Sequence, residues 1–340
     1  YVSTVGKYVA RFESKIAKYT KSKYAIAIIN GTSALHILMK YFGITEKDEV
    51  ILPSLTFVAT ANVIKYCNAT PNFVDSEHNT LGICPVKLAK YLKNNLIKKG
   101  KNSFNKRTNR RVKALIAVHL YGLPCKINEI KKICKKYNLI LIEDAAEGMG
   151  SFLNNKHLGT FGQAGVISFN GNKPITAGGG GIILTSSKKI AKNIKHLSTT
   201  AKINHPWKNV HDQIGYNYRM TNLNAAVGCA QLENIKKIIL SKRKNFESYN
   251  SIFKDSSFGK IISESKNSYS NYWLITLVLK NNLSKNKLLK SLHQNGYKCR
   301  SVWKPLHTLK IFKDCPSDNL KNCLKIYDYS INLPSSPIIN

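Results

Sequence analysis

The sequence predicts an α/β protein with a mostly parallel sheet that is covered by helices on both faces, followed by a smaller α+β domain. Strand-like apolar runs alternate with helix-like periodic segments over the first part of the chain, an order typical of parallel sheets. The chain has 340 residues, which exceeds the usual size of a single core. From residue 222 onward a long helical pattern leads away from the alternating region.

The alternation starts near the N-terminus. An amphipathic helix is predicted over 8–20, and segment 24–44 runs from an apolar strand through Asn30-Gly31-Thr32-Ser33 into a helix. A helix that begins with glycine and hydroxyl residues offers its N-terminus to anions. Residues 48–67 predict a strand, a turn marked by proline and a helix, and residues 70–75 predict another short strand.

The second half of the alternating region carries the first acidic candidates. A strand is predicted over 112–122, a helix over 127–138, and a further strand within 139–151 that ends with Glu143 and Asp144. Parallel sheets bind ligands at the carboxyl ends of their strands. Residues 100–111 are polar and basic without periodicity, which favours a solvated loop over a segment that binds nucleic acid.

The C-terminal part predicts the small domain. One long helix is expected over 222–253, a strand over 272–279 and a helix over 286–297. We therefore expect a large domain with an N-terminal helical segment over residues 1–235 and a small C-terminal domain over residues 236–340.

The net charge of +35 favours a lysine-rich surface over a nucleic-acid or membrane partner. Of the 53 basic residues only seven are arginine, the residue that dominates phosphate and base recognition, and the lysines are scattered. There is no apolar run long enough to cross a bilayer and no signal-peptide pattern. The eight cysteines form no C-x-x-C pair, so we expect no metal site and a reducing cytoplasmic location.

A carboxylate and a lysine end two successive apolar runs. Asp144 closes "LILIED", and Lys173 follows "VISFNGN". A pyridoxal-phosphate enzyme needs such a pair, because the carboxylate keeps the pyridine nitrogen protonated and the lysine carries the cofactor and moves protons. Considered alone, Lys173 is more typical of an exposed surface lysine, and Asp144 is more typical of a residue that caps a helix.

Neighbouring residues strengthen the cofactor reading. The hydroxyl of Ser168 can hold phosphate, and Gly178 to Gly181 allow the backbone to pack closely behind the turn. Glu147 lies one turn after Asp144 and can face the same crevice. Phe57 alone is more typical of a core residue than of a stacking platform.

These motifs, together with "HLYG" at 119–122 and "HDQIGYNYRMTNLNAAVGCAQLE" at 211–233, resemble the DegT/DnrJ/EryC1/StrS family of sugar aminotransferases. The resemblance runs from "YVSTVGKYVARFE" to "PLHTL" and "INLPSSP" and so covers nearly the whole chain. The sequences of the motifs "NGNK", "LSTTAK" and "HPWKNVHDQIGYNYRM" look most like those of the LegC-type branch. The resemblance implies the aspartate aminotransferase-like fold (fold type I), with a mostly parallel seven-stranded sheet in the large domain.

The resemblance also implies roles for the matching residues. Lys173 carries pyridoxal phosphate, Asp144 pairs with its ring nitrogen, and Phe57 stacks on its face. The phosphate contacts are Thr32, Ser33 and Ser168.

Two further positions carry an implied role. Glu147 stands where the family usually has glutamine, near the phenolic oxygen of the cofactor. Asn217 reaches the phosphate of the neighbouring subunit's cofactor, which implies a homodimer with shared active sites.

The activity that the resemblance implies is transfer of the amino group of glutamate to the 4-keto carbon of a UDP-linked N-acetylated 6-deoxy sugar, in the biosynthesis of surface polysaccharide or of legionaminic-type sugars. A GDP- or dTDP-linked ketosugar is the alternative substrate. Six loop residues are candidates for sugar and nucleotide contacts: His205, Trp207, His211, Arg219, Trp303 and His307.

Other functions of an α/β chain fit less well. In the ketosugar dehydratases of this family a histidine replaces the lysine, whereas this chain has Lys173. A regulatory or non-catalytic member of the fold remains a further alternative, but no helix-turn-helix pattern or arginine-rich arm is appended. A dinucleotide-binding dehydrogenase is disfavoured because no G-x-G-x-x-G follows the first strand.

Overall fold

The computed structural model describes residues 3–281 and 285–338. A nine-stranded sheet forms its centre, and seven of these strands follow one continuous path in the order β1-β11-β10-β7-β6-β2-β3. The bounds of these seven strands are Tyr24–Ile28 (β1), Gly181–Thr185 (β11), Ala164–Ser168 (β10), Ile140–Asp144 (β7), Arg111–Val118 (β6), Asp48–Pro53 (β2) and Thr70–Val74 (β3).

Five neighbouring strands of this path, from β10 to β3, pair in parallel, whereas β11 is antiparallel to both β1 and β10. The predicted α/β class and mostly parallel seven-stranded path are therefore confirmed, with β11 as the exception. Parallel pairing brings the carboxyl ends of β7 and β10 to one edge, where Asp144 ends β7 and Ser168 ends β10.

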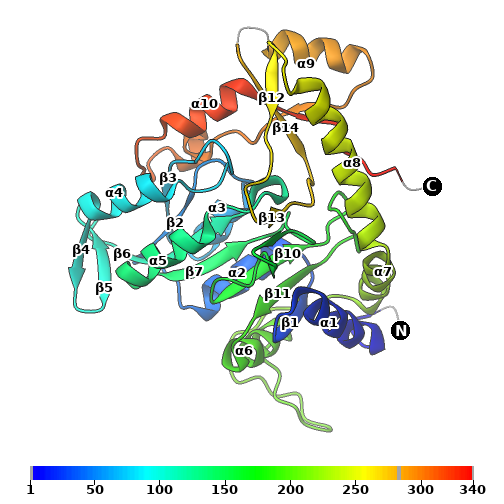
Figure 1. The fold of residues 1–340 in the computed structure, drawn as a ribbon. Coiled ribbons are helices and arrows are strands. Elements are labelled where there is room, and N and C mark those ends of the chain that lie inside the picture. Colours follow the sequence, from blue (N-terminus) through cyan, green and yellow to red (C-terminus); the bar gives the residue numbers. More distant parts are fainter. Residues whose placement is uncertain (1–2, 282–284, 339–340) are drawn as a thin grey trace.

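Helices cover both faces of the sheet, as Figure 1 shows. Side chains of β6 alternate between two cores, since Ala114 and Ile116 join one apolar cluster while Leu115 and Ala117 join the other. The first cluster takes in α2 (Gly31–Tyr41), α3 (Ala59–Tyr66) and α6 (Lys188–Ser198). The second takes in α1 (Lys7–Thr20), α4 (Pro85–Asn95), α5 (Ile127–Tyr137) and α7 (Asn222–Glu233).

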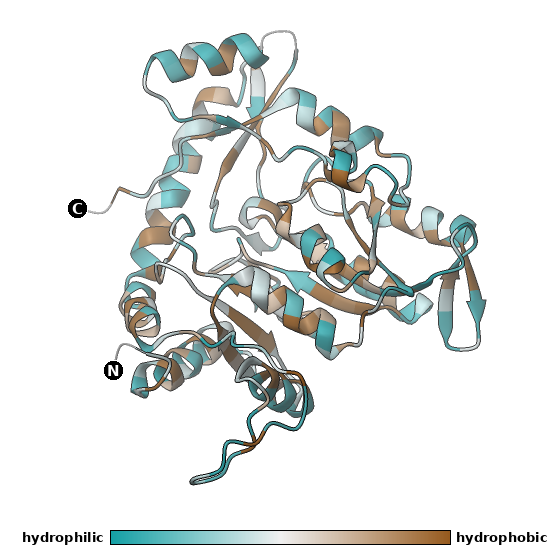
Figure 2. Ribbon diagram, turned by 180° about the vertical axis from the view of Figure 1, so that it is seen from behind, coloured by the Kyte–Doolittle hydropathy of each residue, from teal (hydrophilic) through white to brown (hydrophobic). Residues whose placement is uncertain are grey.

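The distribution of hydropathy follows from this layering. In Figure 2 the central strands are hydrophobic, and the helices around them are hydrophilic on their outer surfaces. Within residues 3–281 and 285–338, no helix is both long enough and apolar enough to span a membrane.

The prediction of a loop over 100–111 was wrong in part. β4 (Leu96–Lys99) and β5 (Asn102–Asn105) form a hairpin, and β5 pairs with β6 to extend the sheet. Two polar side chains of β5 are buried because they find partners: Ser103 Oγ donates to the carbonyl of Tyr137 at 2.8 Å, and Asn105 Nδ2 donates to Glu49 at 2.9 Å. These distant partners let a polar segment form a strand.

The single long helix predicted over 222–253 was also wrong. α7 ends at Glu233 and α8 (Ile235–Phe253) begins after Asn234, whose φ of −99° and ψ of 0° are not helical. The break lies one residue before the predicted domain boundary.

A second sheet lies beyond α8, in the order β12-β14-β16-β15. We propose that this sheet and its helices form the small domain, residues 236–340. Its strands are Gly259–Ile261 (β12), Ile275–Leu279 (β14), Ser330–Leu333 (β16) and Arg300–Ser301 (β15), and its helices are Lys285–Gln294 (α9) and Lys321–Tyr329 (α10). A small sheet of β13 (Ser268–Tyr269), β8 (Phe152–Leu153) and β9 (Lys156–His157) and the short 3-10 helices Leu120–Gly122, Leu306–Thr308 and Lys310–Phe312 complete the fold.

The start of α10 is tied to the large domain by one buried carboxylate. Asp75 follows β3 and accepts the backbone N–H groups of Asn322 at 3.0 Å and Cys323 at 2.8 Å. Lys87 of α4 forms an ion pair with the same side chain. Asp75 therefore caps a helix that is distant in sequence.

Candidate active site

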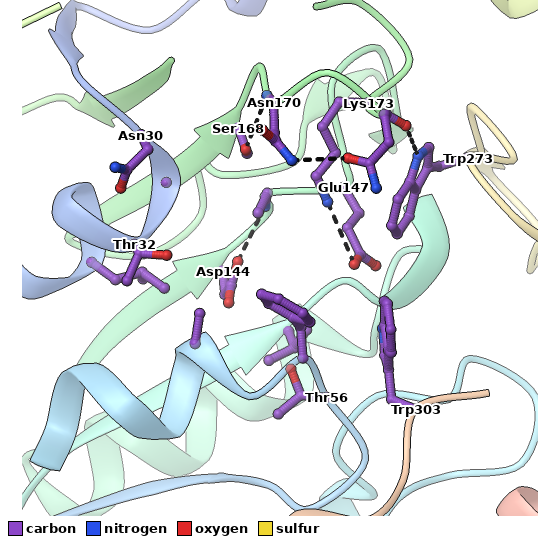
Figure 3. Close-up of a pocket in the computed structure, with 17 residues that line it drawn as sticks. Asn30, Thr32, Thr56, Asp144, Glu147, Ser168, Asn170, Lys173, Trp273 and Trp303 are labelled. Atoms are coloured by element: carbon purple, nitrogen blue, oxygen red, sulfur yellow. Dashed lines mark hydrogen bonds and ion pairs between the residues drawn. The ribbon is translucent and has the colours of Figure 1, made fainter. Parts of the chain in front are cut away.

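The site begins with a buried lysine in the turn after β10. The backbone N–H of Lys173 donates to the carbonyl of Asn170 at 3.0 Å, which closes this turn. Its Nζ lies 3.8 Å from the centre of the Trp273 ring and 3.6 Å from Oε1 of Glu147 (Figure 3). Burial lowers the pKa of Lys173, although Glu147 and Asp144 act in the opposite direction. This lysine is therefore easier to deprotonate than a surface lysine.

Asp144 lies at the carboxyl end of β7 and is held by two donors. Its carboxylate accepts the Thr60 hydroxyl at 2.7 Å and the Ala146 backbone N–H at 3.2 Å. Burial raises the pKa of Asp144, and these two hydrogen bonds oppose that shift. The side chain lines the cavity, so the carboxylate has fixed geometry next to a space that a ligand can occupy.

Glu147 adds a second carboxylate near the lysine. Its Oε2 accepts the backbone N–H of Tyr121 at 2.6 Å, which leaves Oε1 facing Lys173. Burial raises the pKa of Glu147 to about 7, against the opposing effect of Lys173. Tyr121 has a φ of 57°, a left-handed conformation that is uncommon for a residue with a side chain.

The N-terminus of α2 lies opposite these groups. Asn30 caps the helix by accepting the N–H of Ser33 at 2.7 Å. A Cβ built on Gly31 would lie 3.1 Å from Cβ of Ser168, so β10 ends against the helix start. Thr32 and Ser168 both line the cavity there. A helix N-terminus with two hydroxyl groups is suited to a phosphate group.

These groups line one cavity of about 270 Å³. Phe57 lies at its opening, with 49% of its side chain exposed, and its ring centre is 5.3 Å from that of Trp303. Seven residues predicted from the sequence are thus brought together: Thr32, Phe57, Asp144, Glu147, Ser168, Lys173 and Trp303.

Several wall residues were missed by sequence reasoning. Trp273 also lines the cavity, and its indole N–H donates to the carbonyl of Asn172 at 2.6 Å. By contrast, Nε1 of Trp303 is buried and has no hydrogen-bond partner within the described residues. Trp273 lies in the apolar pattern of the strand predicted over 272–279, and Thr56, Asn170 and Asn172 lie in turns, so no signal in the sequence gave them a role in a cavity.

The remaining predicted residues do not line this cavity. Ser33 serves the helix cap through its backbone N–H. His307 is only four residues from Trp303, but it does not line the cavity. Its Nδ1 lies 2.7 Å from the hydroxyl of Ser54. Asn217 is exposed and its backbone pairs with Thr199.

Three other candidates occupy an exposed arm, residues 199–219, which extends away from the body of the molecule (Figure 1). Trp207 is 79% exposed, and its backbone N–H donates to Nδ1 of His205 at 3.3 Å. His211 lies 2.8 Å from the carbonyl of Thr200. At the base of the arm, Arg219 pairs through its backbone with Ile28, and its buried Nε has no partner among residues 3–281 and 285–338.

One cavity contains a helix N-terminus with two hydroxyl groups, a buried carboxylate and a lysine. In the described part of the chain, no three His, Cys, Asp or Glu side chains form a metal-binding group. A ligand of this cavity can place an anionic group at the helix N-terminus and another group near Lys173.

Known proteins agree with this reading. The model of the DegT/DnrJ/EryC1/StrS aminotransferase family matches residues 1–340. A GDP-perosamine synthase of Vibrio cholerae is 37% identical, over 99% of this chain and 88% of its own length. A DegT/DnrJ/EryC1/StrS aminotransferase from Brucella abortus has a TM-score of 0.90 at 27% identity, over 99% of this chain and 87% of that one.

Another solved structure is the aminotransferase PseC of Helicobacter pylori, which is involved in pseudoaminic acid biosynthesis. It has a TM-score of 0.89 at 25% identity, over 99% of this chain and 88% of that one. The chain belongs to the DegT/DnrJ/EryC1/StrS aminotransferase family and is a pyridoxal-phosphate-dependent sugar aminotransferase.

Proposed function

We propose that the enzyme transfers the amino group of glutamate to the 4-keto carbon of a nucleotide-linked 4-keto-6-deoxy sugar. The observation that carries this proposal is the position of Lys173, whose Nζ lies 3.6 Å from Glu147 in a cavity that also contains Asp144 and the start of α2. The cavity thus combines a proton-transfer group with an anion-binding end.

The residues present fit pyridoxal phosphate. The N–H groups at the start of α2, with Thr32 and Ser168, would hold its phosphate, and Asp144 would hold a proton on its ring nitrogen. Phe57 offers a ring face at the cavity opening. When bound, the cofactor supplies an electron sink for the electron pair that remains on carbon when a proton is removed.

Lys173 has the chemistry of the proton carrier. Because burial lowers its pKa, a larger fraction is neutral and can accept a proton from the carbon of the amino donor. Glu147 fixes the position of Nζ through their ion pair, and the Tyr121 N–H in turn fixes Glu147. In the second half of the reaction, the protonated lysine can return a proton to the former carbonyl carbon of the sugar.

The identity of the nucleotide has two supported readings. The sequence around Lys173 and in segment 205–220 resembles that of the LegC-type branch. This resemblance favours a UDP-linked N-acetylated sugar and a role in legionaminic-type biosynthesis. The relative from Vibrio cholerae is named as a GDP-perosamine synthase, which favours a GDP-linked sugar. We place the UDP series first because the NGNK motif, which resembles that branch, contributes Asn170, Asn172 and Lys173 to the cavity.

We also propose a homodimer with shared active sites. The arm carries apolar side chains that its own chain leaves exposed, among them Trp207 at 79% and Ile214 at 85%. A second copy would cover them. In that arrangement Asn217 would contact the cofactor phosphate of the neighbouring subunit. We further propose that the activity is cytoplasmic.

Incubation with a substrate panel tests the function. The purified enzyme with pyridoxal phosphate and glutamate would be mixed with UDP-, GDP- and dTDP-linked 4-keto-6-deoxy sugars, and aminated products would be identified by mass spectrometry. Amination of the UDP series is expected. Turnover of only the GDP series would support the perosamine-type reading, and no amination of any sugar would contradict the proposal.

A further inference from the structure

A second cavity, of about 380 Å³, adjoins the first at Lys173. Asn172, Lys173 and Trp273 line both cavities. The rest of the second wall comes from the turn around Lys173, from β15 and β16 of the small domain with residues next to β14 and β15, from the segment after β16, and from one side chain of α8. Its volume falls within the range of small-molecule sites.

The walls of this second cavity are cationic. Besides Lys173, they carry Lys242, Lys298 and Arg300, and none of the lining residues is aspartate or glutamate. Within the described residues, neither Lys298 nor Arg300 takes part in an ion pair. The cavity is therefore suited to an anion.

Lys242 is the most informative of the three. Its residue is only 4% exposed, and its ammonium group donates to the carbonyls of Ser335 at 2.6 Å and Trp273 at 3.2 Å. A lysine has three N–H donors, and the described residues supply acceptors for two. One donor of a buried cation is thus left at the cavity wall without a partner.

The proposed reaction needs a place for carboxylate groups. Glutamate carries two of them, and its nitrogen must approach the position of Lys173. The first cavity already has two carboxylates near that lysine, Asp144 and Glu147, and its anion end at α2 fits the cofactor phosphate. A donor carboxylate would be repelled by the acidic side chains and attracted by the cations of the second cavity.

We propose that Arg300, Lys298 and Lys242 form the subsite that binds a carboxylate of the amino donor. This inference rests on the proposed function. Arg300 offers the planar pair of N–H groups that matches a carboxylate, while the two lysines add charge and a further donor. The side-chain carboxylate is the one assigned to this subsite, so the subsite selects a dicarboxylic donor over amino acids with neutral side chains.

The test separates the two halves of the reaction. Arg300→Met and Lys298→Met would be compared with Arg110→Met and Lys290→Met, which remove exposed cations outside both cavities. The glutamate half-reaction would be followed by stopped-flow absorbance of the holoenzyme, and the ketosugar half-reaction by the same method after loading with pyridoxamine phosphate. The concentration of glutamate that gives half the maximal rate should rise about 10- to 100-fold in the subsite variants only. The ketosugar half-reaction should change by less than about twofold, since it does not use the subsite.

An equilibrium measurement removes the dependence on turnover. Maleate and glutarate carry two carboxylates but no amino group, so they bind without reacting. Quenching of tryptophan fluorescence by either should report binding, because Trp273 lines the second cavity. The dissociation constant should rise in Arg300→Met and stay unchanged in Arg110→Met. Arg300→Lys should recover part of the affinity, and it replaces Arg300→Met if that variant does not fold.

The outcomes separate the possible failures. Unchanged glutamate and maleate binding in both subsite variants would overturn the inference while leaving transamination intact. If the variants instead lose affinity for the nucleotide sugar and keep their affinity for glutamate, the second cavity binds the diphosphate of the nucleotide sugar and the inference is wrong. If the unmodified enzyme aminates no sugar with any donor, the proposed function itself fails.

Discussion

At the residue scale, the site depends on three ionisable groups that are removed from water. Lys173, Asp144 and Glu147 are buried around one cavity, and burial shifts the pKa of each toward its neutral form. Asp144 is stabilised by two hydrogen bonds, whereas Glu147 depends on Lys173 and on one backbone N–H. The two carboxylates can therefore differ in protonation at neutral pH, which suits different tasks.

Replacing the lysine tests its role most directly. Lys173→Ala should reduce amino transfer by at least about a thousandfold, because it removes both the covalent anchor and the proton carrier. The visible absorbance of the lysine-bound cofactor should be lost as well. Lys290→Ala, on the exposed face of α9, is the matched control. A Lys173→Ala enzyme that still aminates ketosugars would contradict the assignment.

Glu147→Gln tests the raised pKa of the second carboxylate. In the folded protein this pKa is about 7, above the ordinary value of 4.5, so the folded state binds a proton more tightly than the unfolded chain does. This contribution to stability is complete below about pH 4.5 and is lost as the pH rises toward 7. Between pH 5 and 7, urea unfolding of the cofactor-free protein should show a loss of about 1 to 3 kcal/mol relative to Glu147→Gln. Parallel pH profiles for the two proteins would argue against the shift.

At the element scale, helix ends and strand ends place the functional groups. The start of α2 forms the proposed anion site. Asp144 lies at the end of β7, and the turn that carries Lys173 follows the end of β10. A Cβ on Gly181 would lie 2.6 Å from the backbone carbon of Asn30, so only glycine fits at the first position of β11. The close contact keeps the helix start against the sheet edge.

The cap of α10 offers a test of how the two parts of the chain are joined. Asp75→Asn removes a buried charge that accepts two N–H groups of α10 and pairs with Lys87. The free energy of unfolding should fall by about 1 to 3 kcal/mol, measured by urea denaturation at neutral pH. Asp255→Asn, at an exposed position, should change it by less than about 0.5 kcal/mol. Equal effects of the two substitutions would contradict the capping role.

The sequence predicted the elements whose patterns are local. Apolar runs such as Ala114 to Val118 marked the strands, and the cavity residues at strand ends followed from the order of strands and helices. The hairpin at 96–105 was missed because its polar side chains depend on Glu49 and Tyr137, which are distant in sequence. Trp273 was missed for the same reason, since its role appears only when the small domain packs against the turn at Asn172.

At the scale of the whole molecule, the arm is the part that a single chain leaves unexplained. Residues 199–219 hold four of the predicted contact residues and Asn217, yet none of these lines the cavity of its own chain. Exposed Trp207 and Ile214 are consistent with a surface that another copy covers.

Mixed dimers test the shared site. Lys173→Ala and Asn217→Ala homodimers should both be weakly active. Dissociating and remixing them in equal amounts creates heterodimers in which one of the two sites has both Lys173 and Asn217. Activity should recover to about a quarter of that of the unmodified enzyme. No recovery, or a monomer by sedimentation, would contradict the shared-site arrangement.

The antiparallel strand β11 also determines when the site can form. β1 is synthesised well before its strand partner in the sheet, β11, with Ile28 opposite Gly181. The contact between the start of α2 and the edge of the sheet therefore cannot form until residues 181–185 have been synthesised. Such a long sequence separation between pairing strands slows assembly. During synthesis, the proposed anion-binding end of the cavity is therefore completed only after Lys173 has been made.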